Sequence, residues 1–108
     1  MLQREIERIF AQPHGLTVAD MFERARTRMG LTLTELAGLL DVNKSALSRF
    51  ERGINRGLGT EKIIEACSIL GLDAYEVFFK IGELHPDMEA KILSDWKLYD
   101  ELRKALNL

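Results

Sequence analysis

Two short helical patterns separated by a tight break make up the stretch LTELAGLLDVNKSALSRFERG, residues 33–53. The first predicts a helix over residues 33–40, with a buried apolar stripe formed by Leu36, Ala37, Leu39 and Leu40. The second predicts a helix from Lys44 to Arg52, with Asn43 placed to cap its start. Helices this short are marginal in isolation, so both must pack within a larger helical domain.

The second of these helices has two faces of different chemistry. One face suits a hydrophobic core and carries Ala46, Leu47 and Phe50. The opposite face carries long cationic side chains and hydroxyls, namely Lys44, Ser45, Ser48 and Arg49. Such side chains can read the donor and acceptor pattern of base edges in a DNA major groove, which is wide enough for a helix. The four polar residues are therefore candidates for base contacts.

The stretch resembles the helix-turn-helix of the lambda-repressor-like (Xre) DNA-binding proteins. The matching residues are Leu36, Ala37, Val42, Ser48, Glu51 and Gly53, and the likeness extends from about Leu16 through Phe79. The resemblance implies a five-helix DNA-binding domain over residues 16–82, with double-stranded DNA as its partner. It also implies a homodimeric repressor of transcription that binds a palindromic operator, with half-sites about one helical turn apart.

Two residues depart from the family pattern, and one pair follows it. Leu33 stands where the family usually has a glutamine that opens the first helix of the motif. Asp41 stands where it usually has a turn glycine, and aspartate tolerates the left-handed conformation better than most residues. The resemblance further implies a structural ion pair between Arg26 and Glu51.

Charge is segregated along the chain. The net charge is −2, yet residues 24–62 hold eight basic against four acidic side chains, a balance of +4. A local excess of positive charge is what phosphate contact requires. The candidates for phosphate contacts are Thr32, Arg52, Asn55, Arg56 and Lys62.

The remaining composition favours a single all-α domain with short extensions. With 108 residues, 46% of them hydrophobic, the chain can build one core but not two full ones. The lone Cys67 cannot form an internal disulfide, which suits a reducing cytoplasm. No apolar run is long enough to cross a membrane, and residues 1–10 lack the apolar core of a signal peptide.

Amphipathic helices are expected at both ends of the chain. Residues 1–15 predict a short helical arm at Leu2–Gln12, which could pack on the domain or contact a second copy. Residues 83–108 predict one continuous helix from Asp87 to about Leu106. Its apolar stripe is the expected dimer contact, through Met88, Ile92, Trp96, Tyr99 and Leu102, although folding back onto the domain would also bury it.

No pattern predicts an enzyme, a cofactor or a metal site. His14 and His85 each lie beside proline, without a Cys, Asp or His partner at metal-ligand spacing. Two alternatives to a repressor remain. Proteins similar to this one can act as antitoxins that bind a toxin protein, and the chain could also be an interaction module that does not bind DNA. Co-purification with a small partner would favour the first, and insensitivity to DNA at low salt the second.

Overall fold

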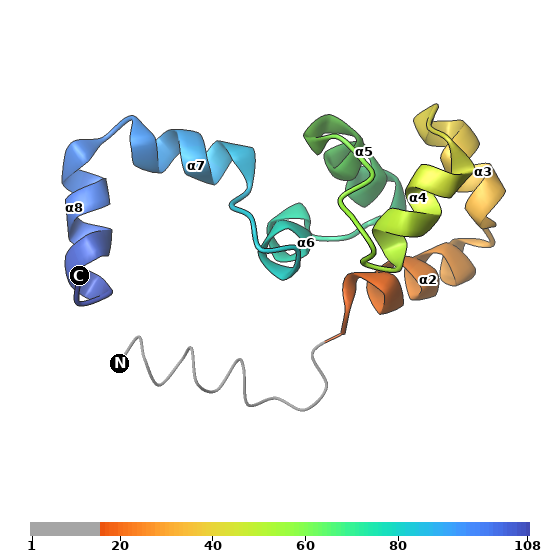
Figure 1. The fold of residues 1–108 in the computed structure, drawn as a ribbon, viewed down its shortest axis with the longest axis horizontal. Helices are drawn as coiled ribbons and strands as arrows, with labels where there is room; N and C mark the ends of the chain where they lie inside the picture. The colour runs from red at the N-terminus through yellow and green to blue at the C-terminus, as the bar shows by residue number, and fades with distance from the viewer. Residues whose placement is uncertain (1–15) are drawn as a thin grey trace. The chain divides into compact units, whose positions relative to one another are not determined.

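The computed structural model describes residues 16–108, and over that range every regular element is an α-helix. The helices are α2 (Val18–Met29), α3 (Leu33–Leu40), α4 (Lys44–Glu51), α5 (Thr60–Leu70), α6 (Ala74–Lys80), α7 (Pro86–Leu93) and α8 (Trp96–Ala105) (Figure 1). The expected all-α class is confirmed. The arm predicted at Leu2–Gln12 lies outside the described residues.

Local hydrogen bonds at the helix ends explain where the first helices begin. Thr17 and Thr32 both form reciprocal capping boxes, the first with Asp20 and the second with Glu35. The Asn43 side chain accepts a hydrogen bond from the Ser45 backbone N–H at 2.9 Å, which confirms the predicted cap of α4. Asp41 ends α3 in the left-handed conformation with φ 53°, so aspartate does replace the usual turn glycine.

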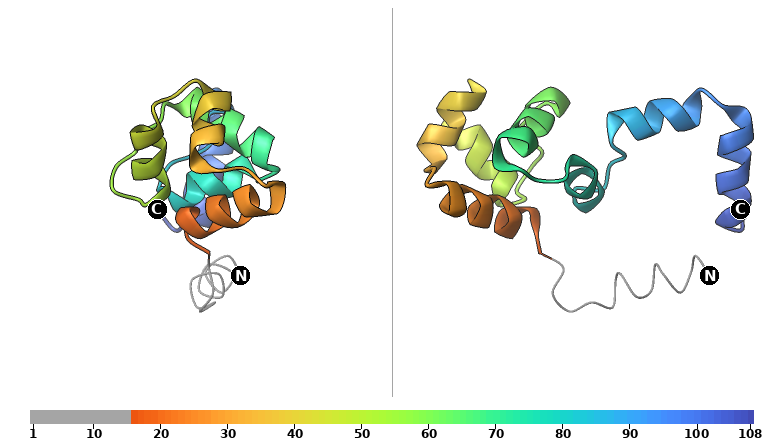
Figure 2. Two further views of the ribbon diagram at one scale, coloured as in Figure 1. Left: turned by 90° about the vertical axis from the view of Figure 1, so that its right-hand side faces the viewer. Right: turned by 180° about the vertical axis from the view of Figure 1, so that it is seen from behind.

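The helices α2 to α6 belong to one compact unit, residues 16–85, with a single hydrophobic core. Phe22, Leu36, Leu47 and Ile63 are fully buried there and come from four different helices. The views in Figure 2 show α2 to α5 packed around this core. Leu39 was expected in the buried stripe of α3, but it is 56% exposed, because only Leu36, Ala37 and Leu40 turn inward.

The segment that follows α6 is fixed onto that helix. The Glu83 backbone N–H donates to the Phe78 carbonyl at 2.9 Å. The His85 ring is buried and stacks on Tyr75 with 4.0 Å between ring centroids. The edge of Phe78 lies against the same imidazole at 5.4 Å. Residues 82–85 therefore follow a defined path along α6 and do not form a loose tail.

The prediction of a single C-terminal helix from Asp87 to about Leu106 is wrong, because the structure has two helices there. Residues 86–108 form their own unit, with a break at Ser94 and Asp95 between α7 and α8. The Asp95 side chain accepts from the backbone N–H groups of Lys97 and Leu98, at 3.0 and 3.3 Å, and so begins a new helix. The predicted stripe is divided accordingly: Met88 and Ile92 lie on α7, and Trp96, Tyr99 and Leu102 on α8.

Candidate nucleic-acid interface

The helix α4 turns an apolar side toward the core and leaves its polar side outward. Leu47 and Phe50 are buried, and the Phe50 ring meets Phe22 of α2 edge to face with 5.2 Å between centroids. Of the four residues predicted to contact bases, Lys44 and Ser45 are exposed, whereas Ser48 and Arg49 are half-buried. All four lie on one short helix whose other side is anchored, so they can act as a set.

The Ser45 hydroxyl already has a partner within the helix cap. Its Oγ donates to the Asn43 side-chain oxygen at 2.7 Å, beside the bond from the Ser45 backbone. A hydroxyl has one donor and two acceptor lone pairs, so its oxygen can still accept a hydrogen bond. While this bond persists, Ser45 can contact a base edge as an acceptor only.

An ion pair ties the end of α4 to α2. The Arg26 Nε donates to the Glu51 carboxylate at 3.1 Å, and its Nη1 donates to the Leu31 carbonyl at 3.4 Å. The Glu51 side chain is 8% exposed and the Arg26 side chain 17%. Burial raises the pKa of Glu51 above its ordinary value, while Arg26 opposes that rise. The pair joins α2 to the helix that carries the candidate base contacts.

The loop after α4 is held against that helix by a close backbone approach at Gly57. Gly57 has φ +61°, and a Cβ placed on it would lie 2.7 Å from the Ala46 carbonyl oxygen. The same Cβ would lie 3.1 Å from the Asn55 side-chain oxygen. Only glycine fits this conformation and this space. The loop therefore runs directly beside α4, with Arg52 and Asn55 exposed on it.

Arg56 is the most highly bonded of the predicted phosphate contacts. Its Nε donates to Glu83 at 2.8 Å, its Nη1 to the Leu58 carbonyl at 3.3 Å, and its Nη2 to the Thr60 hydroxyl at 2.6 Å. No sequence pattern pointed to Glu83 as a partner, because it lies 27 residues further along the chain. Any phosphate that approaches Arg56 therefore meets a guanidinium that is already paired.

The other two predicted phosphate contacts also have partners. Lys62 lies 3.6 Å from Glu65 on the same helix, in an i,i+3 pair. The Thr32 hydroxyl accepts the Glu35 backbone N–H at 3.1 Å, as part of the cap of α3. An exposed pair on one helix contributes little to stability, so Lys62 remains available to an anion.

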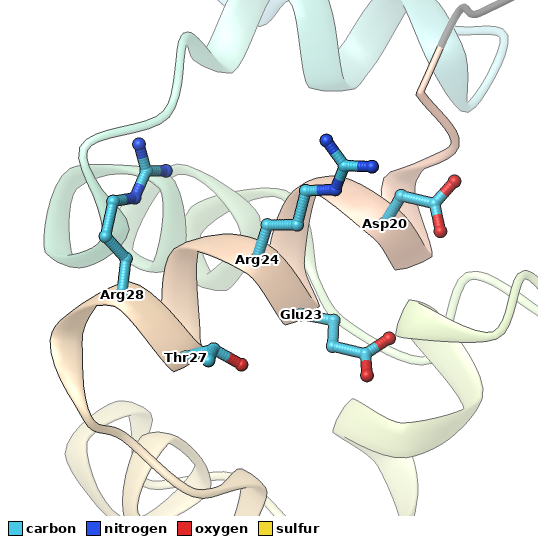
Figure 3. Close-up of a pocket in the computed structure, with 5 residues that line it drawn as sticks. All are labelled: Asp20, Glu23, Arg24, Thr27 and Arg28. Atoms are coloured by element: carbon cyan, nitrogen blue, oxygen red, sulfur yellow. The ribbon is translucent and has the colours of Figure 1, made fainter.

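A shallow hollow on the outer side of α2 carries mixed charge. Asp20, Glu23, Arg24, Thr27 and Arg28 line it, and Figure 3 shows the two guanidinium groups extending in the same direction, away from Glu23 and Thr27. All five side chains come from one helix, so they do not converge on a common point. The hollow has the character of a solvated helix face.

The described residues contain neither a cluster of metal ligands nor a reactive cysteine. Within residues 16–108, no group of three or more His, Cys, Asp or Glu side chains is placed to hold a metal ion. Burial raises the pKa of the Cys67 thiol to about 11, with a further contribution from Asp73. Its thiolate is therefore scarce at neutral pH. In the same part of the chain, no helix combines the length and the apolar character that a membrane span needs.

Comparison with known proteins decides the family. The helix-turn-helix family model matches residues 22–77, which is more than half of the chain. The chain belongs to the lambda-repressor-like (Xre) helix-turn-helix family. No significant match was found among curated proteins or among solved structures. The matched range begins within α2 and ends within α6, so it contains the whole helix-turn-helix, α3 and α4.

Membership in this helix-turn-helix family confirms the predicted resemblance and the fold that it implied. The five helices α2 to α6 form the family's DNA-binding domain. Members of the family are DNA-binding regulators of transcription, and the family is not an enzymatic one.

Proposed function

We propose that this helix-turn-helix protein is a sequence-specific repressor that binds a palindromic DNA operator as a homodimer. Its base contacts come from Lys44, Ser45, Ser48 and Arg49 on α4. Its phosphate contacts come from Thr32, Arg52, Asn55, Arg56 and Lys62. In a two-fold dimer, the two copies of α4 enter successive major grooves on one side of the duplex.

The observation that supports this proposal is the anchoring of α4 by three sets of contacts. The buried Leu47 and Phe50, the Arg26–Glu51 pair and the close approach of the Gly57 loop fix the helix in the domain. A helix that presents cationic and hydroxyl groups from a rigid support loses little conformational entropy when it contacts base edges.

Arg49→Ala tests the base-reading role. The substitution should weaken binding to the preferred operator by about 1–3 kcal/mol and relax the preference at one base pair, because Arg49 is the candidate for a bidentate contact to guanine. Fluorescence anisotropy on the operator and on single-base variants measures both effects. Arg24→Ala removes the same charge from the exposed side of α2 and should leave the base preference unchanged. An equal loss on every sequence would make Arg49 a phosphate contact.

The dimer is proposed to form through the apolar residues of α7 and α8. Neither helix contains a buried residue, and Trp96 is 71% exposed. Its indole stacks on Tyr99, with 5.7 Å between ring centroids. Met88, Ile92 and Leu102 supply the rest of this surface. An exposed tryptophan beside further apolar side chains is typical of an interface, where such residues dominate the binding energy.

Trp96→Ala should shift the protein toward monomer in sedimentation velocity and raise the dissociation constant of the dimer at least about tenfold. The reason is that a central aromatic residue commonly contributes about 2 kcal/mol or more to the free energy of association. Leu108→Ala is the control, because Leu108 is an exposed apolar residue of the same unit outside the proposed contact. An unchanged dimer mass for Trp96→Ala would exclude this contact. A monomeric wild-type protein would favour a different occupant for the apolar surface, such as the toxin partner of an antitoxin.

A further inference from the structure

The contact between Arg56 and Glu83 joins the loop beside α4 to the segment that leaves α6. The guanidinium donates in three directions, to the Glu83 carboxylate, the Leu58 carbonyl and the Thr60 hydroxyl. Of these partners, only Glu83 carries a charge. The contact therefore neutralises the arginine as well as orienting it.

The Glu83 carboxylate is held in place by its neighbours in the chain. The Glu83 backbone N–H donates to the Phe78 carbonyl at 2.9 Å, and Gly82 makes the turn with φ 83°. Two residues later the His85 ring is buried against Tyr75 and Phe78. These contacts fix the path of the backbone on both sides of Glu83, so its carboxylate remains beside the loop.

The Arg56 guanidinium is in turn fixed beside the proposed DNA-reading helix. Gly57 follows it directly, and the backbone there approaches the Ala46 carbonyl of α4 so closely that a Cβ would lie 2.7 Å away. A positive charge on this loop lies where the phosphates that flank the major groove are expected, provided that α4 enters the groove as proposed above.

We propose that Glu83 competes with a DNA phosphate for Arg56 and thereby lowers both the affinity for DNA and its dependence on salt. The Arg56 and Glu83 side chains are 38% and 41% exposed, and an ion pair this exposed is weak enough for a phosphate to displace. The displaced carboxylate still lies close to the incoming phosphate. Its negative charge repels the phosphate. The DNA therefore keeps a counterion that it would release on binding an uncompensated guanidinium.

Glu83→Gln tests the competition, because it removes the charge and keeps the shape of the side chain. Binding to a random-sequence DNA duplex is measured by fluorescence anisotropy over a series of salt concentrations. Each phosphate contact contributes about 0.9 to the slope of log affinity against log salt, so the variant should have a slope steeper by about one unit. Its advantage over the wild type should therefore fall roughly threefold between about 50 and about 200 mM salt.

Three further variants assign the effect to Arg56, namely Arg56→Ala, its combination with Glu83→Gln, and Glu76→Gln. In the background of Arg56→Ala, Glu83→Gln should no longer change the slope, because the guanidinium that it releases is missing. Glu76→Gln is the control for the change in overall charge, since Glu76 pairs with Lys80 at 3.6 Å and not with Arg56. It should leave the slope within the error of the wild type. Circular dichroism confirms that all variants keep their helical content.

Three results would contradict the competition. If Glu83→Gln behaves like Glu76→Gln, the carboxylate does not compete with phosphate. If Glu83→Gln weakens binding, the carboxylate orients Arg56 toward the phosphate. If the steeper slope persists in the Arg56→Ala background, the effect does not pass through Arg56. Each of these leaves the proposed DNA binding intact when the wild-type protein binds the duplex. A wild-type protein that does not bind DNA at low salt would overturn both proposals.

Discussion

Arg26→Ala should lower the free energy of unfolding by about 3 kcal/mol, because it leaves a buried carboxylate without its partner. The Glu51 side chain is only 8% exposed, and the two hydrogen bonds of Arg26 to Glu51 and to the Leu31 carbonyl are lost together. Urea denaturation followed by circular dichroism measures the change. Arg24→Ala is a matched control on the same helix, exposed to solvent, and should change stability by less than about 0.5 kcal/mol.

The pH dependence of the Arg26→Ala defect provides an independent check. Burial raises the pKa of Glu51 above its ordinary value of 4.5, and Arg26 lowers it through a hydrogen bond and through its charge. Without Arg26 the folded-state pKa rises further. A carboxyl group whose pKa is higher in the folded state contributes stability at low pH, and this contribution is lost as the pH rises through the folded-state pKa.

The stability difference between Arg26→Ala and the wild type should therefore shrink as the pH is lowered from about 7 toward the ordinary Glu51 value of 4.5. Adding Glu51→Gln to Arg26→Ala should recover part of the stability at neutral pH, since it removes the uncompensated charge. A defect that is constant with pH, and that Glu51→Gln does not reduce, would mean that Arg26 stabilises the protein through packing alone.

Gly57→Ala should lower the free energy of unfolding by roughly 2–4 kcal/mol, since the new methyl group meets two separate obstacles. Its φ of +61° is unfavourable for alanine, and its Cβ would lie 2.7 Å from the Ala46 carbonyl oxygen, a backbone atom that cannot swing aside. The loop must then move away from α4. We expect DNA affinity measured by anisotropy to fall as well, at a temperature where the variant is still folded.

Gly53→Ala separates the two causes. Gly53 has a similar φ of +70°, but a Cβ there has no heavy atom within 4 Å. Its replacement should cost only the left-handed conformation, about 1 kcal/mol. Equal losses at Gly53 and Gly57 would show that the close approach to α4 contributes nothing to stability.

The features of the domain that follow from neighbouring residues could be predicted from the sequence. The caps at Thr32 and Asn43 involve side chains and backbone groups only two or three residues apart, so the residue types were sufficient. The left-handed Asp41 followed from the family resemblance, which usually has a turn glycine there, and from the tolerance of aspartate for that conformation. The partners Arg26 and Glu51 are 25 residues apart, and only the family resemblance connected them.

A side-chain cap that interrupts the helix explains why the prediction of one continuous C-terminal helix was wrong. The apolar spacing through Met88, Trp96 and Leu102 continues across Ser94 and Asp95, so periodicity alone predicted one helix. Aspartate, however, favours the cap position, where its side chain bonds the backbone N–H groups that follow. Here Asp95 does so, and the Ser94 hydroxyl donates to the Lys91 carbonyl at 3.0 Å at the end of α7.

The ion pair between Arg56 and Glu83 could not be predicted from sequence patterns for a different reason. The place of Arg56 in a glycine-containing loop after α4 suggested an open phosphate contact. Its partner Glu83 comes from the segment after α6, and only the tertiary fold brings that segment to the loop. No local spacing encodes a contact across 27 residues, so the charge of the loop could not be judged from the basic residues alone.

The most direct test of the proposed function is selection of binding sites from a pool of random DNA duplexes. The selected sequence is then titrated by fluorescence anisotropy at two salt concentrations. We expect an enriched palindrome with half-sites about ten base pairs apart. The protein should bind it at least about a thousandfold more tightly than random DNA. Arg49→Ala should change the base preference within each half-site. A pool without any enriched sequence, together with weak binding that salt abolishes, would contradict a sequence-specific repressor.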